Sequence, residues 1–187
     1  MHSFNYLLPA LFWNVSQPTY EDLGNLSTGG SLGLGQVTTA TLRSEPGFQP
    51  SFTATFLHGE DYLTIDPSDG ISRPGLSGIV IPDDGSVPFQ MQASGIQYPD
   101  ATLASIVATN KTKGLAIPYG AVYSGKKKMW VPTFRGGSEK YANLQNSIFV
   151  ASETVSDSPN ANEFYVGMKI SKVFATNTSV VIGDEFP

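Results

Sequence analysis

Residues 51–95 place the tightest limit on the fold, because apolar and polar side chains alternate there in runs separated by turn residues. Phe52, Ala54 and Phe56 take every second position, and His58 continues the series. Alternation with a period of two puts such side chains on one face of an extended chain. This stretch is therefore expected to form short strands with one apolar face.

Turn residues and further alternating runs extend this pattern along the chain. Pro82-Asp83-Asp84-Gly85 joins two apolar runs and predicts a hairpin. Other strands are expected over residues 6–15, 32–43, 128–135 and 163–174, with loops over 16–31 and 113–124. Asp100 is placed to cap a short helix, ATLASIVAT. About seven to ten strands with one short helix predict an all-β fold, a single antiparallel barrel in preference to a sandwich.

Length and charge narrow the organisation and the partners. The 187 residues fit one domain, with a core over about residues 6–174 and a tail over 175–187. A formal net charge of −5 argues against a nucleic-acid partner. The basic run Lys126-Lys127-Lys128 is expected to be a solvated turn or a guard of an edge strand.

The chain contains no cysteine, which excludes disulfides and thiolate metal sites. The run YLLPALFW is too short, and too interrupted by proline, to cross a membrane, and no membrane partner is expected. It also lacks the basic start and the cleavage site of a signal peptide. A cytoplasmic protein is therefore expected, and secretion is the alternative because four Asn-x-Ser/Thr triplets are present.

Asp61 is the first candidate for chemistry. It shares one face of an expected strand with Leu63 and Ile65. A carboxyl group on an apolar face has a raised pKa, stays protonated more readily and can donate or relay a proton. The alternative is an ionised structural residue that pairs with Arg135 or caps a turn.

Three further residues are candidates for moving or holding a proton. Asp84 either serves its turn or points into the mouth of the barrel as an acid or base. His58 either accepts a proton or is a hydrogen-bonded core residue. Arg135 either pairs with Asp61 or steadies an oxygen of a ligand. A metal site built from His58, Glu60 and Asp61 is only a weak alternative, and no metal is expected.

The order of several short motifs resembles a superfamily of lipocalin-like (calycin) β-barrels long catalogued as a domain of unknown function. The resemblance spans about residues 6–174, and its segments are His58-Gly59-Glu60-Asp61-Tyr62, Pro82-Asp83-Asp84-Gly85, Phe134-Arg135, and the run from Glu139 to Asn146 before Ile148-Phe149-Val150-Ala151. Tyr62 and Asn143 stand where the family usually has tryptophan. Both departures reshape the expected pocket, so no substrate is carried over from the family at large.

The resemblance implies an activity because a fungal member of the family, in phenalenone biosynthesis, closes a cyclic ether without a redox cofactor. It adds a phenol hydroxyl across the alkene of a prenyl group. The resemblance therefore predicts a cofactor-independent cyclase that acts on an aromatic polyketide. In this hypothesis Asp61 or Asp84 supplies the acid, and Arg135 and His58 orient and deprotonate the phenol. The expected substrate-binding residues, which the pattern does not separate from ordinary core, are Tyr62, Phe56, Phe89, Met91, Trp130, Phe134 and Tyr141.

Two other functions stay open at this point. A non-catalytic barrel that binds a hydrophobic small molecule needs the same pocket but no group that transfers a proton. A lyase or hydrolase acting on a lactone needs a positioned water. A homo-oligomer also stays open, with residues 97–124 and the tail as candidates for an interface or a lid.

Overall fold

The computed structural model describes residues 5–16, 19–101, 103, 122–123, 128–157 and 164–175. Its strands are β1 (Tyr6–Ser16), β2 (Thr19–Asn25), β3 (Ser31–Ser44), β4 (Thr53–Ile65), β5 (Ser72–Pro82), β6 (Phe89–Gln97), β7 (Val122–Tyr123), β8 (Lys128–Gly136), β9 (Phe149–Asp157) and β10 (Phe164–Phe174). A short 3₁₀ turn, Glu139–Tyr141, leads into the helix α2 (Ala142–Gln145).

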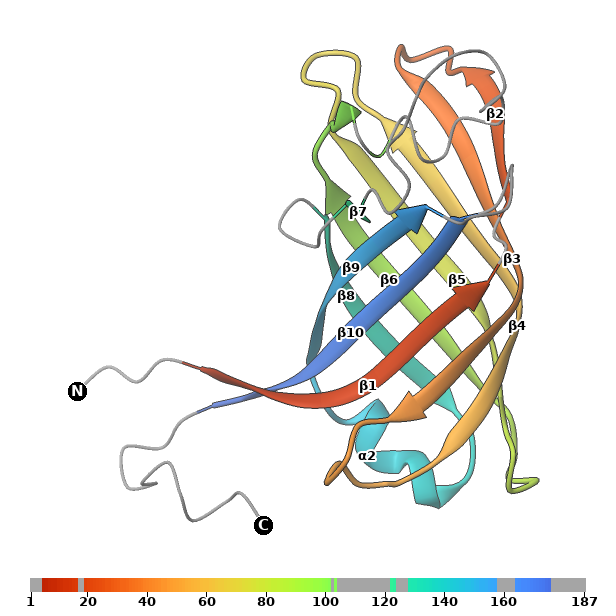
Figure 1. Ribbon diagram of the computed structural model, residues 1–187, viewed down its shortest axis with the longest axis vertical. Helices are drawn as coiled ribbons and strands as arrows, with labels where there is room; N and C mark the ends of the chain where they lie inside the picture. Colours follow the sequence, from red (N-terminus) through yellow and green to blue (C-terminus); the bar gives the residue numbers. More distant parts are fainter. Residues whose placement is uncertain are drawn as a thin grey trace.

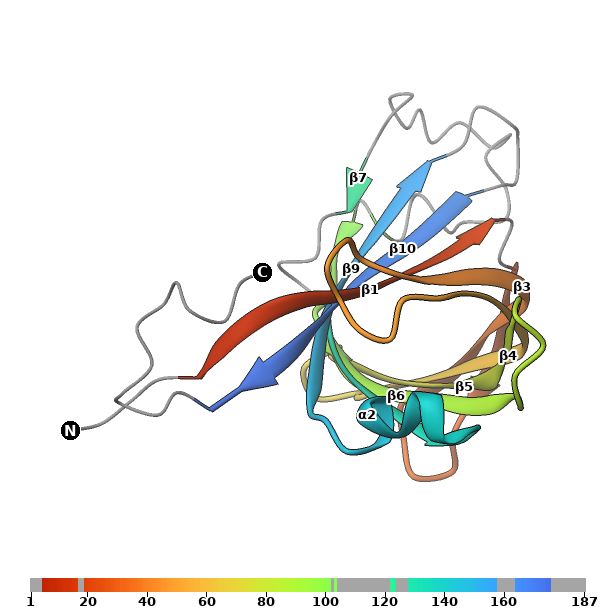
Figure 2. The ribbon, with the colours of Figure 1, turned by 90° about the horizontal axis from the view of Figure 1, so that it is seen from below.

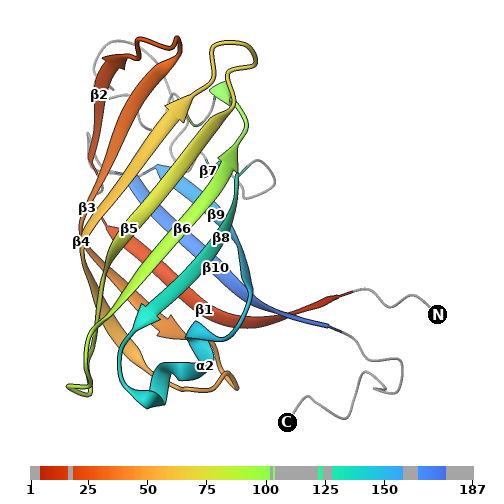
Figure 3. The ribbon, with the colours of Figure 1, turned by 180° about the vertical axis from the view of Figure 1, so that it is seen from behind.

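Eight of these strands close into an antiparallel barrel, as expected from the sequence (Figures 1 and 3). The hydrogen-bonded order runs β1-β10-β9-β8-β6-β5-β4-β3, and β3 pairs back with β1 from Leu11↔Ser44 to Val15↔Ala40. Strand β2 pairs with β3, and β7 pairs with β9. Closure leaves the eight strands of the barrel with no free edge.

The expected strands at 6–15, 32–43, 128–135 and 163–174 are confirmed by β1, β3, β8 and β10. The loop expected over residues 16–31 is wrong in part, because Thr19–Asn25 pairs with β3 as strand β2. Its alternation is weak because a register shift lies between Asp22 and Gly24.

The expected turn at residues 82–85 is confirmed, since the Gly85 amide donates to the Pro82 carbonyl. The amide of Leu103 donates to Asp100 Oδ1, as a helix cap does, but most of ATLASIVAT lies outside the described residues. Most of the expected loop 113–124 and of the tail lies outside them too. No helix among the described residues is long and apolar enough to span a membrane.

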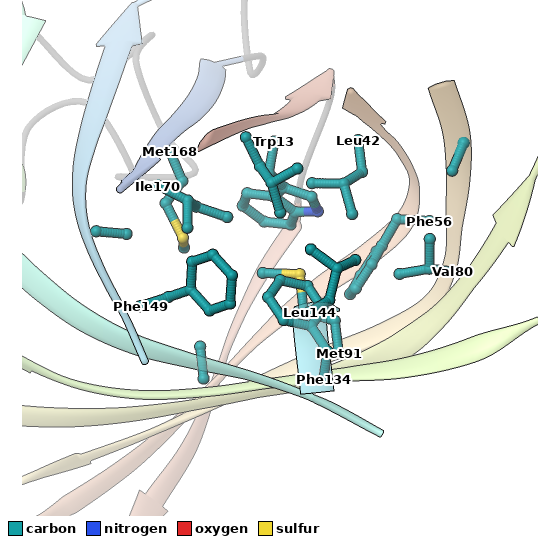
Figure 4. Close-up of a cluster of buried hydrophobic side chains, with 14 of the residues drawn as sticks. Trp13, Leu42, Phe56, Val80, Met91, Phe134, Leu144, Phe149, Met168 and Ile170 are labelled. Atoms are coloured by element: carbon teal, nitrogen blue, oxygen red, sulfur yellow. The ribbon is translucent and has the colours of Figure 1, made fainter. Parts of the chain in front are cut away.

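Helix α2 covers one end of the barrel, a helix that the sequence analysis does not predict (Figure 2). It forms because it buries Leu144 and follows the buried Tyr141. The ring of Tyr141 packs against Phe52 and Phe89, with ring centroids 5.2 and 4.9 Å apart. Figure 4 shows Leu144 among the large apolar side chains inside the barrel. Apolar side chains therefore fill this end, called here the closed end.

Two glycines make room for the ring of Phe56 in this core. The ring of Phe56 is fully buried, and a Cβ built on Gly78 would lie 2.2 Å from it. A Cβ on Gly59 would lie 2.5 Å from the same ring. The packing of Phe56 therefore requires that these inward positions carry no side chain.

We expect Gly78→Ala to lower the free energy of unfolding by about 1–3 kcal/mol, because the added methyl group overpacks the core against Phe56. Gly75→Ala is the matched control, since Gly75 lies on the same strand but is exposed, with its nearest neighbour, the Tyr62 carbonyl oxygen, at 3.9 Å. Urea unfolding of both variants measures the difference. Equal losses in the two variants would contradict the packing argument.

Candidate functional site in the barrel cavity

The end of the barrel opposite α2 contains a cavity of about 990 Å³. Strand β2, the β4–β5 connection and the end of β6 surround it, and Figures 1 and 3 place these segments together at that end. Its apolar wall consists of Val15, Val37, Leu63, Ile65, Leu103, Val155, Phe164 and Val166. The volume is in the range of sites that enclose a drug-sized molecule.

Three ionisable side chains meet across the lumen beside the filled part of the core. Asp61 comes from β4, Lys128 from β8 and Glu153 from β9. The Lys128 ammonium lies 2.9 Å from Glu153 Oε1 and 3.8 Å from Asp61 Oδ2. Only 5% of Lys128 and 3% of Glu153 is exposed. We call these three residues the ionic trio.

The pair formed by Lys128 and Glu153 is held firmly. The indole nitrogen of Trp130 donates to Glu153 Oε2 over 2.8 Å. The Lys128 ammonium also lies 4.6 Å from the centre of the Trp130 ring, a cation–π distance. Both oxygens of Glu153 are therefore occupied, one by the ammonium and one by the indole.

Asp61 is the less satisfied carboxyl group of the ionic trio. Burial raises its pKa to about 6, with a further upward contribution from Glu153, against opposing contributions from Lys128 and the Gly75 amide. Its Oδ1 atom is buried and makes no hydrogen bond of good geometry. Asp61 therefore holds a proton more readily than an exposed aspartate does.

Carboxyl groups dominate the charged part of the cavity. Among the described residues five line it, from Glu21, Asp22, Asp61, Asp100 and Glu153, against the ammonium of Lys128. Such a lining favours a neutral or cationic guest and disfavours an anionic one. Among the described residues, no three histidine, aspartate or glutamate side chains are grouped so that they could hold a metal ion.

Of the four residues expected to carry the chemistry, the structure places only Asp61 in this cavity. Asp84 lies in the exposed β5–β6 turn near the closed end, where its carboxylate pairs with Lys140 and accepts from the Ser86 amide. The Lys140 ammonium holds the pKa of Asp84 well below its usual range. Asp84 therefore serves its turn, which was the alternative left open for it.

His58 and Arg135 both face solvent. A register shift between Leu57 and Glu60 interrupts the alternation after Phe56, and His58 has a φ of 52°. Arg135 shares a face with Met129 and Val131, and that face is the outside of the barrel. The alternative in which Asp61 pairs with Arg135 is therefore wrong, and Lys128 is the cation beside Asp61.

Most of the expected substrate-binding residues lie elsewhere in the barrel. Tyr62 is exposed on the outer surface, and the buried side chains of Phe56, Phe89, Met91, Phe134 and Tyr141 belong to the hydrophobic core and do not line the cavity. Trp130 is buried next to the cavity through its contacts with Lys128 and Glu153.

Lys128 and Glu153 were not among the expected site residues, although the sequence carries a signal for each. Lys128 is in phase with Trp130 and Phe134, and all three are buried. Glu153 is in phase with Ala151 and Val155. The expectation that Lys128 belongs to a solvated basic run is therefore wrong, because the inward phase of β8 begins at this residue.

Comparison with solved structures finds the same fold in several proteins at low identity. A protein of unknown function from Clostridium acetobutylicum is 18% identical, with a TM-score of 0.65 over 93% of this chain and 100% of that one. A β-barrel-like protein from Acinetobacter baumannii is also 18% identical, with a TM-score of 0.63 over 93% and 99%. An enzyme from Penicillium herquei is 16% identical, with a TM-score of 0.52 over 93% and 96%.

A comparison with curated proteins finds no match. A family described as "Protein of unknown function (DUF3237)" matches residues 7–173, which include every strand of the closed barrel apart from its outermost residues. The chain therefore belongs to the DUF3237 family.

Proposed function

We propose that this protein is a cofactor-independent cyclase of fungal natural-product biosynthesis that adds a phenol hydroxyl to a prenyl alkene. The observation that carries the proposal is Asp61, a carboxyl group with a pKa of about 6 on the wall of an apolar cavity. Likeness in fold to an enzyme from Penicillium herquei supports it at the level of architecture. The motif resemblance to a barrel family with a known fungal cyclase supports the reaction type.

The proposed reaction needs one proton to enter and one to leave. The protonated carboxyl group of Asp61 gives its proton to the terminal alkene carbon, and the phenol oxygen bonds to the neighbouring carbon. The phenol proton then passes to the Asp61 carboxylate, which restores the acid. Substrate and product are isomers, and no electron is transferred. A positioned acid of this kind typically contributes about 10²–10⁴-fold to the rate.

The charges around Asp61 suit this step. Positive charge develops on the alkene carbon as it is protonated, and the excess of carboxyl groups in the cavity stabilises it. Lys128 takes the place beside Asp61 that the sequence assigned to Arg135, and its ammonium stabilises the Asp61 carboxylate that remains once the proton has been given to the alkene. Glu153 and Trp130 fix the position of that ammonium.

A non-catalytic barrel that binds a hydrophobic molecule is the second candidate, favoured by the cavity of about 990 Å³. The lining limits what such a carrier would hold. Five carboxyl groups against one ammonium disfavour a fatty acid or another organic anion. Turnover of a neutral prenylated phenol separates the two candidates, because a carrier returns it unchanged.

We expect Asp61→Asn to lower the rate of cyclisation of a reverse-prenylated phenolic polyketide by about 10²-fold or more, because the amide supplies no acidic proton. His58→Ala and Arg135→Ala are the controls, and both are expected to retain the rate because these residues lie on the outer surface. Chiral chromatography against a no-enzyme blank measures formation of the product. Full activity in a folded Asp61→Asn variant would refute the role of Asp61.

The rate of cyclisation should also depend on pH, and its direction follows from Asp61 acting as the acid. Asp61 must be protonated to start the reaction, so kcat is expected to fall as pH rises through about 6. Initial rates between pH 4.5 and 8, in buffers of constant ionic strength, give the profile. A rate that rises through that range would assign the group as a base and contradict the proposed step.

The raised pKa of Asp61 also predicts that the free energy of unfolding depends on pH, which can be measured without a substrate. Between about pH 4 and 6 the folded chain keeps the Asp61 proton while the unfolded chain has lost it, so stability falls as pH rises through that window. At ~1.4 kcal/mol per pH unit this amounts to at most about 3 kcal/mol. Urea unfolding at several pH values should show that Asp61→Asn removes this component. Identical slopes in wild type and variant would show that the pKa of Asp61 is not raised.

A further inference from the structure

Three inward positions on neighbouring strands form a row across the cavity wall. Tyr20 on β2 is paired with Gly35 on β3, and Gly35 is paired with Asp61 on β4. All three line the cavity. The row therefore presents an aromatic side chain, a bare stretch of backbone and the proposed acid, in that order.

The backbone at Gly35 is open toward the cavity. The three heavy atoms nearest to a Cβ built there all belong to Asp61, the nearest at 3.5 Å, so Tyr20 comes no closer than these. The glycine two residues earlier is different, because a Cβ on Gly33 would lie 2.3 Å from the hydroxyl oxygen of Tyr20. The phenol ring of Tyr20 thus already lies on the bare backbone of Gly33.

We propose that Gly35 forms a slot in which the planar phenolic ring of the substrate lies flat on the β3 backbone, between Tyr20 and Asp61. This inference deepens the proposed function and rests on it, because it names the shape of the substrate at the same site. Tyr20 on Gly33 shows that a phenol ring fits against a glycine of this strand. The slot selects planar aromatic rings over saturated rings of the same carbon skeleton.

The dimensions of the sheet fit such a ring. Neighbouring strands lie about 4.8 Å apart, so the backbones of Tyr20 and Asp61 are separated by roughly 9–10 Å across Gly35. A flat ring can occupy this width only if the residue between Tyr20 and Asp61 has no side chain. In this position the edge of the ring contacts Tyr20, and the ring's substituents reach Asp61.

The test compares binding of 2-naphthol and of its saturated counterpart, decahydro-2-naphthol, by isothermal titration calorimetry. Neither molecule has an alkene side chain that can cyclise, so binding is measured without turnover. Wild type is expected to prefer 2-naphthol by about three- to tenfold, the ratio that an aromatic edge contact provides. Gly35→Val should abolish the preference, and Gly35→Ala should reduce it. Tyr20→Leu should reduce it as well, because the aromatic edge is lost.

Gly75→Val is the matched control, since it adds the same side chain to a strand of the same sheet on the outer surface. It is expected to keep the wild-type preference. A Gly35→Val variant that folds and still prefers 2-naphthol would overturn the slot, and so would a wild type that binds both probes equally. If Gly35→Val does not fold, an unchanged preference in Gly35→Ala overturns it. Asp61→Asn kinetics test the proposed function separately, so the two failures are distinguishable.

Discussion

The interior of a closed eight-stranded barrel is the constraint on which the remaining structure depends. Side chains have to fill that interior or leave a cavity within it. In this chain the two outcomes occupy different ends. Aromatic and aliphatic side chains, covered by α2, fill the closed end, while a cavity of about 990 Å³ lies at the other. The ionic trio lies between them.

The ionic trio is costly to bury, and its parts are satisfied unequally. Removing charged groups from water costs several kcal/mol per ion, which is recovered only through good geometry and additional hydrogen bonds. Lys128 and Glu153 meet that condition through their 2.9 Å contact and the indole of Trp130. Asp61 does not, since its distance to the ammonium is 3.8 Å and its Oδ1 makes no good hydrogen bond. The desolvation cost that Asp61 does not recover raises its pKa.

The alternation of side chains was enough to predict the barrel, its main strands and the inward position of Asp61. It was not enough to locate the cavity. The rings of Phe56 and Phe89 alternate as cavity-lining residues would, but which end of a barrel is filled depends on how α2 covers it and where glycines make room. His58 was misplaced because a single register shift reverses the faces of a strand. Lys128 was misplaced because it ends a run of three lysines, and that run outweighed its phase with Trp130 and Phe134.

The unequal satisfaction of the two carboxyl groups suits the proposed proton transfer better than it suits simple binding. A barrel that only holds an apolar molecule gains nothing from a buried aspartate, and an apolar residue of similar size would cost less. A site that moves a proton needs the opposite arrangement: one carboxylate fixed as a permanent charge and a second kept near neutral pH between its two protonation states. In the proposed reaction Asp61 has the second role, and Lys128 lies between Asp61 and Glu153. The open backbone of Gly35 next to Asp61 then provides a place for the group that receives the proton.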